Sequence, residues 1–234
     1  MNDVTRGFVQ AWQLVVTLDP DFVEIVLLSL VVSGLAVLLG TALGVPAGAL
    51  LGLYSFPGKR LVQVVVGTLM GLPPVVLGLV AYLALSRSGP LGALGWLFTP
   101  RAMVLAQFIL VTPIIAGLSA AAVAGVEGNV RLTALGLGAN RRQVLATMIL
   151  EARFAVMAAV AAGLGRALAE VGAVMMVGGN ILHETRVMTT AIVLATGEGR
   201  FDLAIALGLV LLGVAFVLNA GIAVLQRAGG GGRA

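Results

Sequence analysis

The sequence predicts an all-α integral membrane protein with several transmembrane helices. Hydrophobic residues make up 60% of the 234 residues and charged residues 10%, against about 25% charged residues in an average soluble domain. Several apolar runs also exceed the roughly 18 residues that indicate a membrane span. Too few charged side chains remain to cover a protein of this size in water, so lipid is expected around much of the chain.

The composition also excludes several kinds of site. Cysteine is absent, and His183 is the single histidine, so disulfides, cysteine-ligated metals and histidine clusters are excluded, and we expect no metal and no cofactor on this chain. A membrane-embedded enzyme would need a cluster of His, Asp or Cys at membrane depth, and this composition almost excludes such a cluster. The net charge of +4 comes from arginines in short loops between apolar runs, a placement that favours membrane orientation over nucleic-acid binding.

Five apolar segments predict five spans. They are expected at about residues 22–53, 61–85, 102–124, 154–177 and 203–225, within one membrane domain of residues 22–226. Residues 1–21 precede it, and their apolar stretch is too short to cross a bilayer, which favours an interfacial helix. A further stretch at 187–196 is also too short to span, and the Gly-rich residues 227–234 predict a flexible tail.

Glycines and prolines mark particular places within these spans. Gly40, Gly44, Gly48 and Gly52 recur every four residues, so they share one helix face on which another backbone can pack closely. Pro73–Pro74 is expected to interrupt the second span near mid-membrane, and Thr112–Pro113 the third. Irregular backbone at that depth faces protein or a water-filled path, which makes these four residues and Asn180 candidates for a pathway or gate, although prolines also simply kink helices.

The loops predict the orientation of the chain. Eight cations are assigned to the cytoplasmic side: Lys59, Arg60, Arg131, Arg141, Arg142, Arg153, Arg227 and Arg233. Five arginines then lie outside, at positions 6, 87, 101, 186 and 200. By the positive-inside rule, the N-terminus is expected outside and the C-terminus in the cytoplasm.

One pair of ionisable residues is expected at membrane depth. Arg166 and Glu170 are one helical turn apart and close enough to pair, and such groups should point into the helix bundle. Two interpretations stay open, a structural ion pair that fixes helix packing and an element of a pathway or gate. Because Glu170 alone would repel an anion, a neutralised pair is favoured over a substrate-binding site.

The longest polar interruption, residues 126–153, predicts a docking site for a soluble partner. Its stretch Leu132-Thr-Ala-Leu-Gly-Leu-Gly138-Ala-Asn-Arg-Arg-Gln-Val144 and following residues to Leu150 resembles the coupling loop of ABC importer permeases, in which a short helix, a glycine and a second short helix follow in order. The family pattern has Glu-Ala-Ala before the glycine and Ile-x-Leu-Pro at the end, where this chain has Thr133-Ala134-Leu135 and Met148-Ile-Leu150-Glu151. The alternative is an exposed basic loop that only sets topology.

Residues expected to couple to an ATPase follow from this resemblance: Thr133, Ala134, Leu135, Gly138, Ala139, Arg141, Arg142, Val144 and Leu150. Small residues such as Ala134 and Gly138 would let a helix lie in a groove of another protein. Arg141 and Arg142 would provide polar contacts at its rim.

The resemblance covers nearly the whole chain. The segments Phe56-Pro-Gly-Lys-Arg60, Leu72-Pro-Pro-Val-Val-Leu-Gly78 and Gly179-Asn-Ile181 with Thr185-Arg186 are similar to the molybdate, sulfate and tungstate permease group. Residues 165–181 and 186–192 look most like tungstate permeases, whereas molybdate permeases tend to have Gly-Glu-Phe-Gly-Ala-Thr where this chain has Ala169-Glu-Val-Gly-Ala-Val174.

The resemblance implies the five-span type I ABC importer permease fold and an ATP-driven oxyanion importer, of tungstate first and of molybdate or sulfate as alternatives. It implies a second copy of the chain with the pathway at the homodimer interface, an outside oxyanion-binding protein, and a location in a prokaryotic inner membrane. The chain lacks a Gly-x-x-x-x-Gly-Lys-Ser/Thr phosphate loop, so ATP and Mg are expected on two separate cytoplasmic subunits. An ion-coupled secondary transporter, the other alternative, would carry an inverted repeat and more buried ionisable residues.

Overall fold

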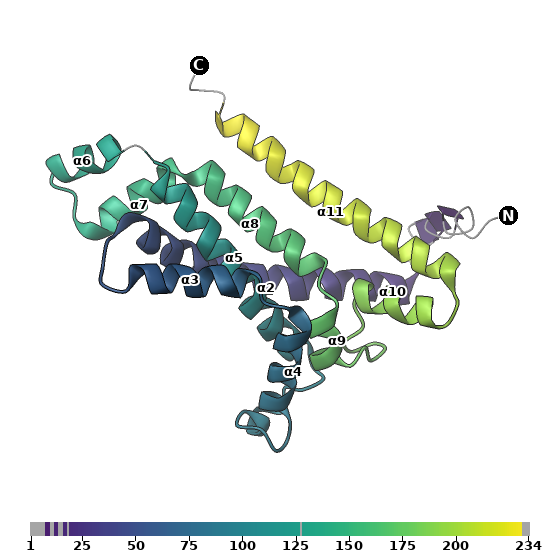
Figure 1. Cartoon of the computed structure of the whole chain (residues 1–234). Coiled ribbons are helices and arrows are strands. Elements are labelled where there is room, and N and C mark those ends of the chain that lie inside the picture. Colours follow the sequence, from purple (N-terminus) through teal and green to yellow (C-terminus); the bar gives the residue numbers. More distant parts are fainter. Residues whose placement is uncertain (1–7, 10–11, 14–15, 18, 127, 231–234) are drawn as a thin grey trace. The chain divides into compact units, whose positions relative to one another are not determined.

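The structure is a computed structural model of the whole chain, and it describes residues 8–9, 12–13, 16–17, 19–126 and 128–230. Helices connected by loops make up this described part, with no strand (Figure 1). The helices are α2 (Pro20–Leu53), α3 (Lys59–Met70), α4 (Pro74–Leu85), the short 3-10 helix η1 (Gly92–Leu94), α5 (Pro100–Ala124), α6 (Gly128–Gly136), α7 (Arg141–Glu151), α8 (Arg153–Leu168), α9 (Gly172–Gly178), α10 (Met188–Gly197) and α11 (Phe201–Gly230).

Three of the described helices, α2, α5 and α11, are long and apolar enough to cross a membrane, and up to five spans result if each of two bent helix pairs counts as one. These pairs are α3 with α4, as expected, and α7 with α8, which bend by 74°. The fourth span expected from the sequence, residues 154–177, combines α8 with α9 and not α7 with α8. The membrane-spanning, all-helical class is therefore confirmed, and the number of spans is three to five.

The chain forms two compact units. The first contains Met1–Ala36, Pro73–Gln107 and Gly165–Ala220, and the second contains Val37–Leu72, Phe108–Leu164 and Gly221–Ala234. In the first unit, Phe22, Ala191 and Leu207 form a buried apolar cluster that joins α2, α10 and α11.

In the second unit, α2 packs on α5 through its glycine face. A side chain added at Gly40 would lie 2.8 Å from Val111 Cγ2, and one added at Gly48 would collide with the carbonyl oxygen of Ala116. The close-packing face expected from the four-residue glycine spacing is thus confirmed. In lipid, where apolar burial does not drive helices together, such close approach supplies the dispersion energy that holds them.

The two proline sites behave differently. The break expected at Pro73–Pro74 is confirmed, because α3 ends at Met70 and α4 begins at Pro74. The interruption expected at Thr112–Pro113 is wrong, since α5 continues through Pro113 to Ala124. A proline inside a helix removes one hydrogen bond, and packed neighbours in a membrane bundle can tolerate that loss.

The structure divides the expected span at 154–177 into α8 and α9. Helix α8 ends at Leu168, and Glu170 Oε1 accepts the backbone N–H of Ala173 at 2.9 Å in the first turn of α9. An acidic side chain that bonds to the amides at a helix start favours a new helix there. The expected interfacial segment lies mostly outside the described residues. At the other end of the chain, α11 extends to Gly230, past residue 227, where the tail was expected to begin.

Candidate functional site

The polar stretch between α5 and α8 contains the two short helices that were expected, α6 and α7, which we call the α6–α7 segment (residues 128–151). Four residues, 137–140, connect them. All of the segment belongs to the second unit. Because the connection is short, the conformation of its residues sets the angle between the two helices.

Gly138 ends α6 by adopting a left-handed conformation with φ of +82°. Its N–H donates to Leu135 O at 3.0 Å, and the N–H of Ala139 donates to Ala134 O at 3.0 Å. This pair of hydrogen bonds is the Schellman arrangement, which closes a helix around one left-handed residue and strongly favours glycine there. The sequence singled out Gly138 for docking, and the structure gives it a conformational role.

Asn140 starts α7 with a reciprocal pair of caps. Its Oδ1 accepts the backbone N–H groups of Arg142 and Gln143, both at 3.0 Å, while Gln143 Oε1 accepts the N–H of Asn140 at 2.8 Å. Such a capping box satisfies donors that the helix itself leaves open. Hydrogen bonds therefore fix the connection at both ends, which sets the orientation of α6 relative to α7.

One side of the segment anchors it to the rest of the second unit. Val144 and Met148 of α7 are buried against Ala49 and Val123, with 3% or less of their surfaces exposed. Ala134 and Ala139 are partly buried against the same cluster. Three of the residues expected to couple, Ala134, Ala139 and Val144, thus hold the segment in place.

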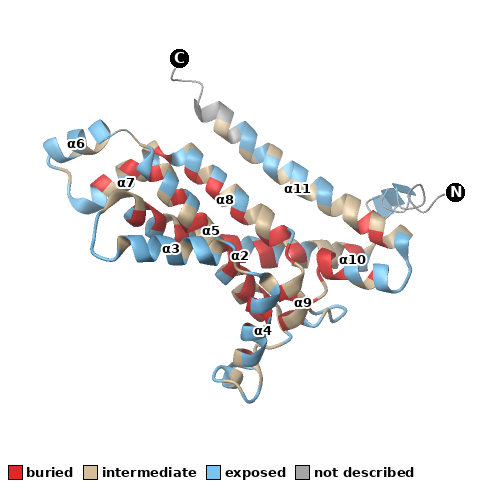
Figure 2. Cartoon of the chain, in the orientation of Figure 1, coloured by how far each residue is buried: buried red, intermediate tan, exposed pale blue. Residues whose placement is uncertain are grey.

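The other side leaves apolar and basic side chains exposed, and Figure 2 shows α6 mostly in the colour of exposed residues. Leu137 is 84% exposed, Leu132 66% and Leu150 61%. Of the expected residues, Thr133, Leu135, Arg141, Arg142 and Leu150 are all exposed. Leu132 and Leu137 were not among the residues expected to couple. The sequence feature that could have identified them is an apolar side chain within a short, polar loop.

The first unit holds the expected ion pair. Arg166 Nη1 lies 3.3 Å from Glu170 Oε2, and the Glu170 side chain is 2% exposed whereas that of Arg166 is 33% exposed. The pairing predicted from the sequence is confirmed. Thr189 Oγ1 donates to the backbone oxygen of Glu170 at 2.9 Å, so a buried carboxylate and its backbone join the end of α8 to α9 and α10.

The remaining pathway candidates are only partly brought together. Pro73 is the N-cap of α4 and Pro74 its first residue, a position where the missing N–H of proline is not needed. Next along the chain, Val75 touches Gly172 beside Glu170. Thr112 belongs to the second unit, where its hydroxyl donates to Phe108 O at 2.6 Å.

Asn180 lies in the loop between α9 and α10, with a positive φ of +53°. Its backbone oxygen accepts a hydrogen bond from Arg186 Nη2 at 3.3 Å. Its buried side-chain oxygen, Oδ1, has no hydrogen-bond partner among the residues that the structure describes. This candidate therefore has a fixed backbone and one acceptor that is left open.

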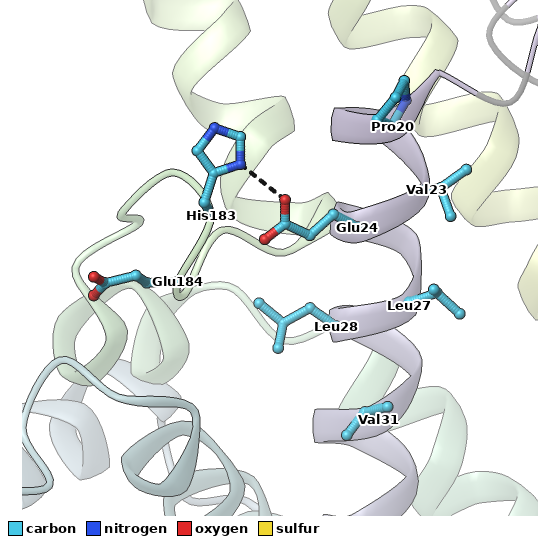
Figure 3. Close-up of a pocket in the computed structure, with 8 residues that line it drawn as sticks. All are labelled: Pro20, Val23, Glu24, Leu27, Leu28, Val31, His183 and Glu184. Carbon is cyan, nitrogen blue, oxygen red and sulfur yellow. Dashed lines mark hydrogen bonds and ion pairs between the residues drawn. The ribbon is translucent and has the colours of Figure 1, made fainter.

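The same loop contacts the start of α2 through His183, which bonds to Glu24 where both residues line an open groove of about 770 Å³ (Figure 3). His183 Nδ1 lies 2.8 Å from Glu24 Oε2. The hydrogen bond to Glu24 raises the pKa of His183 above 6.5, the nearby charges of Glu24 and Asp21 add to this, and Arg186 opposes it. Both side chains are about half exposed, so the contact is a solvated one.

Comparisons with known proteins agree with this architecture. No protein-family model matches the chain. The tungstate uptake system permease protein TupB of Peptoclostridium acidaminophilum is 41% identical over 227 residues, which is 97% of this chain and 100% of the relative. A probable anion ABC transporter permease protein of Haloferax volcanii is 43% identical over 203 residues, 85% of this chain and 88% of the relative.

A solved structure shares the fold. A bacterial ABC transporter involved in the import of the acidic polysaccharide alginate superposes with a TM-score of 0.73 at 21% identity, covering 95% of this chain and 82% of that chain. At this identity the likeness supports the fold alone. The two relatives, which match 85% or more of this chain at 41% and 43% identity, show that it belongs to the family of ABC transporter permease proteins, multi-pass membrane subunits of transporters.

Proposed function

We propose that this chain is the membrane-spanning subunit of an ATP-driven tungstate importer. The observation that carries the proposal is the 41% identity to a tungstate uptake permease over 97% of the chain. A match of this length includes every helix of the fold and both candidate sites. Molybdate and sulfate are the competing substrates, and the experiment below separates them from tungstate.

The α6–α7 segment is the proposed docking site for an ATP-binding subunit. Its rigid connection, its buried anchors Val144 and Met148 and its exposed Leu137 support this role, because a docking surface needs a fixed frame and apolar side chains that lack a partner. Arg141 and Arg142 would contact the rim of the partner. ATP and Mg would bind to that partner and not to this chain.

The assembled importer would contain two copies of this chain, two cytoplasmic ATP-binding subunits and an oxyanion-binding protein on the outer side. Within each copy we propose five spans, an N-terminal interfacial helix, an outer N-terminus and a cytoplasmic C-terminus. The seven cations of the described part of the second unit, against the single acid Glu151, support a cytoplasmic side for the α6–α7 segment.

Substrate would pass by alternating access along the interface between the two copies. The candidates for the path are Pro73, Pro74, Thr112, Pro113, Arg166, Glu170 and Asn180. Because Arg166 neutralises Glu170, the pair would let a dianion pass without binding it tightly, and the outside binding protein would supply the affinity.

Competition between anions tests the substrate. The chain, its ATP-binding subunit and its binding protein are reconstituted in liposomes. Uptake of labelled tungstate is measured with a tenfold excess of unlabelled tungstate, molybdate or sulfate, and uptake of labelled molybdate and sulfate is measured in parallel. We expect uptake to fall only when unlabelled tungstate is the competitor. Dominant uptake of sulfate or molybdate would overturn the tungstate assignment, and uptake without ATP would overturn the ATP-driven mechanism.

A further inference from the structure

Tyr54 lies where α2 meets the α6–α7 segment, and its side chain contacts both helices of that segment, α6 through the ring and α7 through the hydroxyl. It follows Leu53, the last residue of α2, and its backbone N–H donates to Leu50 O at 3.0 Å, so it continues the last turn of the helix. Its hydroxyl donates to the carbonyl oxygen of Arg141, the first residue of α7, at 3.4 Å. All of these residues belong to the second unit.

Arg131 of α6 makes the second contact. Its guanidinium carbon lies 5.7 Å from the centre of the Tyr54 ring, within the range in which a cation is attracted to an aromatic face. Its Nη1 also donates to Leu53 O at 3.4 Å. The last carbonyls of a helix have no partner within the helix and carry its negative dipole end, so a guanidinium is favoured there.

These contacts matter because α6 has little else to hold it. No residue of α6 is buried, and Val130 and Ala134 are only partly covered. By contrast, α7 is anchored by buried side chains. The end of α2 therefore touches both helices at one point, and the fixed connection at Gly138 and Asn140 makes those helices move together.

Helix α2 is also suited to carry a displacement away from this point. It is unbroken from Pro20 to Leu53, and its glycines at 44, 48 and 52 lie directly against the backbone of α5. A closely packed rigid helix transmits a shift at its end where a loop would absorb it.

We propose that Tyr54, with Arg131, is a clasp that converts movement of the α6–α7 segment into movement of α2. This inference rests on the proposed function, because an ATP-binding subunit must supply the movement. Tyr54 is then a positioning residue: it contacts neither ATP nor anion, and its loss separates ATP hydrolysis from transport.

The test is the ratio of tungstate uptake to ATP hydrolysis in the reconstituted importer. Tyr54→Leu removes the ring and the hydroxyl, and we expect it to lower this ratio about tenfold while the ATP-binding subunit still co-purifies. Tyr54→Phe keeps the ring beside Arg131 and loses only the hydroxyl, so a drop of about threefold is expected. Arg131→Lys, which keeps a cation, should retain more of the ratio than Arg131→Gln.

Phe56→Leu is the matched control. Phe56 lies two residues further along, in the loop between α2 and α3, and is 41% exposed, and its replacement should leave the ratio unchanged. An unchanged ratio in both Tyr54 variants overturns the clasp, even if uptake and hydrolysis fall together. Failure of the wild-type chain to bind an ATP-binding subunit contradicts the proposed function instead, so the two failures are distinguishable.

Discussion

The two compact units hold their helices together in different ways. Among the described residues, eight buried positions are polar or charged, and seven of these belong to the first unit: Ser29, Ser33, Gln107, Glu170, Thr185, Thr189 and Thr190. The second unit has only Ser119 of this set. Its characteristic contact is instead the glycine face of α2 against the backbone of α5.

The first unit uses its polar groups to fix irregular backbone. Thr185 Oγ1 bonds to Gly178 O across the loop after α9, Ser29 Oγ accepts the N–H of Met188 at 2.8 Å, and Glu170 joins three helices. In a membrane such groups must find partners within the protein. The first unit therefore combines buried hydrogen bonds with close glycine contacts such as Gly78 against Ala173, whereas the described part of the second unit depends mainly on close packing.

Charge separates the two units as well. The described part of the second unit contains Lys59, Arg60, Arg131, Arg141, Arg142, Arg153 and Arg227 with one acid, Glu151, whereas the described part of the first contains seven acids and five arginines. The difference teaches that one fold can carry a basic surface, the proposed docking site for a soluble partner, on one unit and a buried polar network on the other. The following substitutions test whether each unit depends on the feature assigned to it.

The largest effect is expected in the second unit, from Gly48→Ala. The new methyl group would collide with the carbonyl oxygen of Ala116 and lie 3.0 Å from Ser119 Cβ, so α2 and α5 must separate. Overpacking of this kind destabilises by about 3 kcal/mol when backbone has to move. Thermal unfolding in detergent measures it, with Gly34→Ala as control, because nothing lies within 4 Å of a side chain there. Equal melting temperatures for the two variants would contradict packing through glycine.

The next effect is expected in the first unit, from Glu170→Ala. The substitution leaves Arg166 without this ion partner and removes the acceptor of the Ala173 N–H. We expect a loss of about 2 kcal/mol, less than for a fully buried pair because Arg166 is one-third exposed.

Glu170→Gln separates the two contributions of Glu170. It keeps an oxygen for the Ala173 N–H and removes the negative charge, so its unfolding temperature should lie between those of the wild type and Glu170→Ala. If both variants unfold like the wild type, the buried polar network does not specify the first unit.

Much of this architecture could be predicted from residue patterns. Apolar run length locates α2, α5 and α11, because each is a single unbroken helix. The spacing of Gly40 to Gly52 predicts the packing face, and Pro73–Pro74 predicts the break before α4, since these features depend on local chemistry alone.

Features that depend on distant contacts could not be predicted. The break between α8 and α9 has no proline to mark it: Glu170 caps the new helix locally at Ala173, but the distant contact of Gly172 with Val75 is not visible in the sequence. The continuity of α5 through Pro113 likewise depends on its neighbours. At the α6–α7 segment, sequence similarity identified the region, but only the structure separates the anchoring Val144 from the exposed Leu137.

A smaller effect is expected from Leu137→Ala, which tests whether the exposed side of the second unit is a docking surface. Leu137 is 84% exposed, so folding should not change, whereas burial of a leucine at an interface contributes about 1.5 kcal/mol, or about tenfold in affinity. Affinity of the purified chain for its ATP-binding subunit is the measurement. Leu61→Ala is the control, since Leu61 is 69% exposed on α3, outside the segment; equal affinities for all three proteins would contradict docking through Leu137.

The smallest effect concerns His183 and Glu24 at the solvated edge of the first unit. Because the contact raises the pKa of His183 above 6.5, its contribution to stability is fully present below pH 6.5 and is lost as pH rises through the higher folded-state pKa. The melting temperature of the wild type should therefore exceed that of His183→Asn at pH 5.5, and the two should converge by pH 8.5. Glu24→Gln should abolish the same pH dependence. A difference that grows with pH would have the wrong sign for a histidine held by a carboxylate, and would show that this edge is fixed by uncharged contacts like the buried interior.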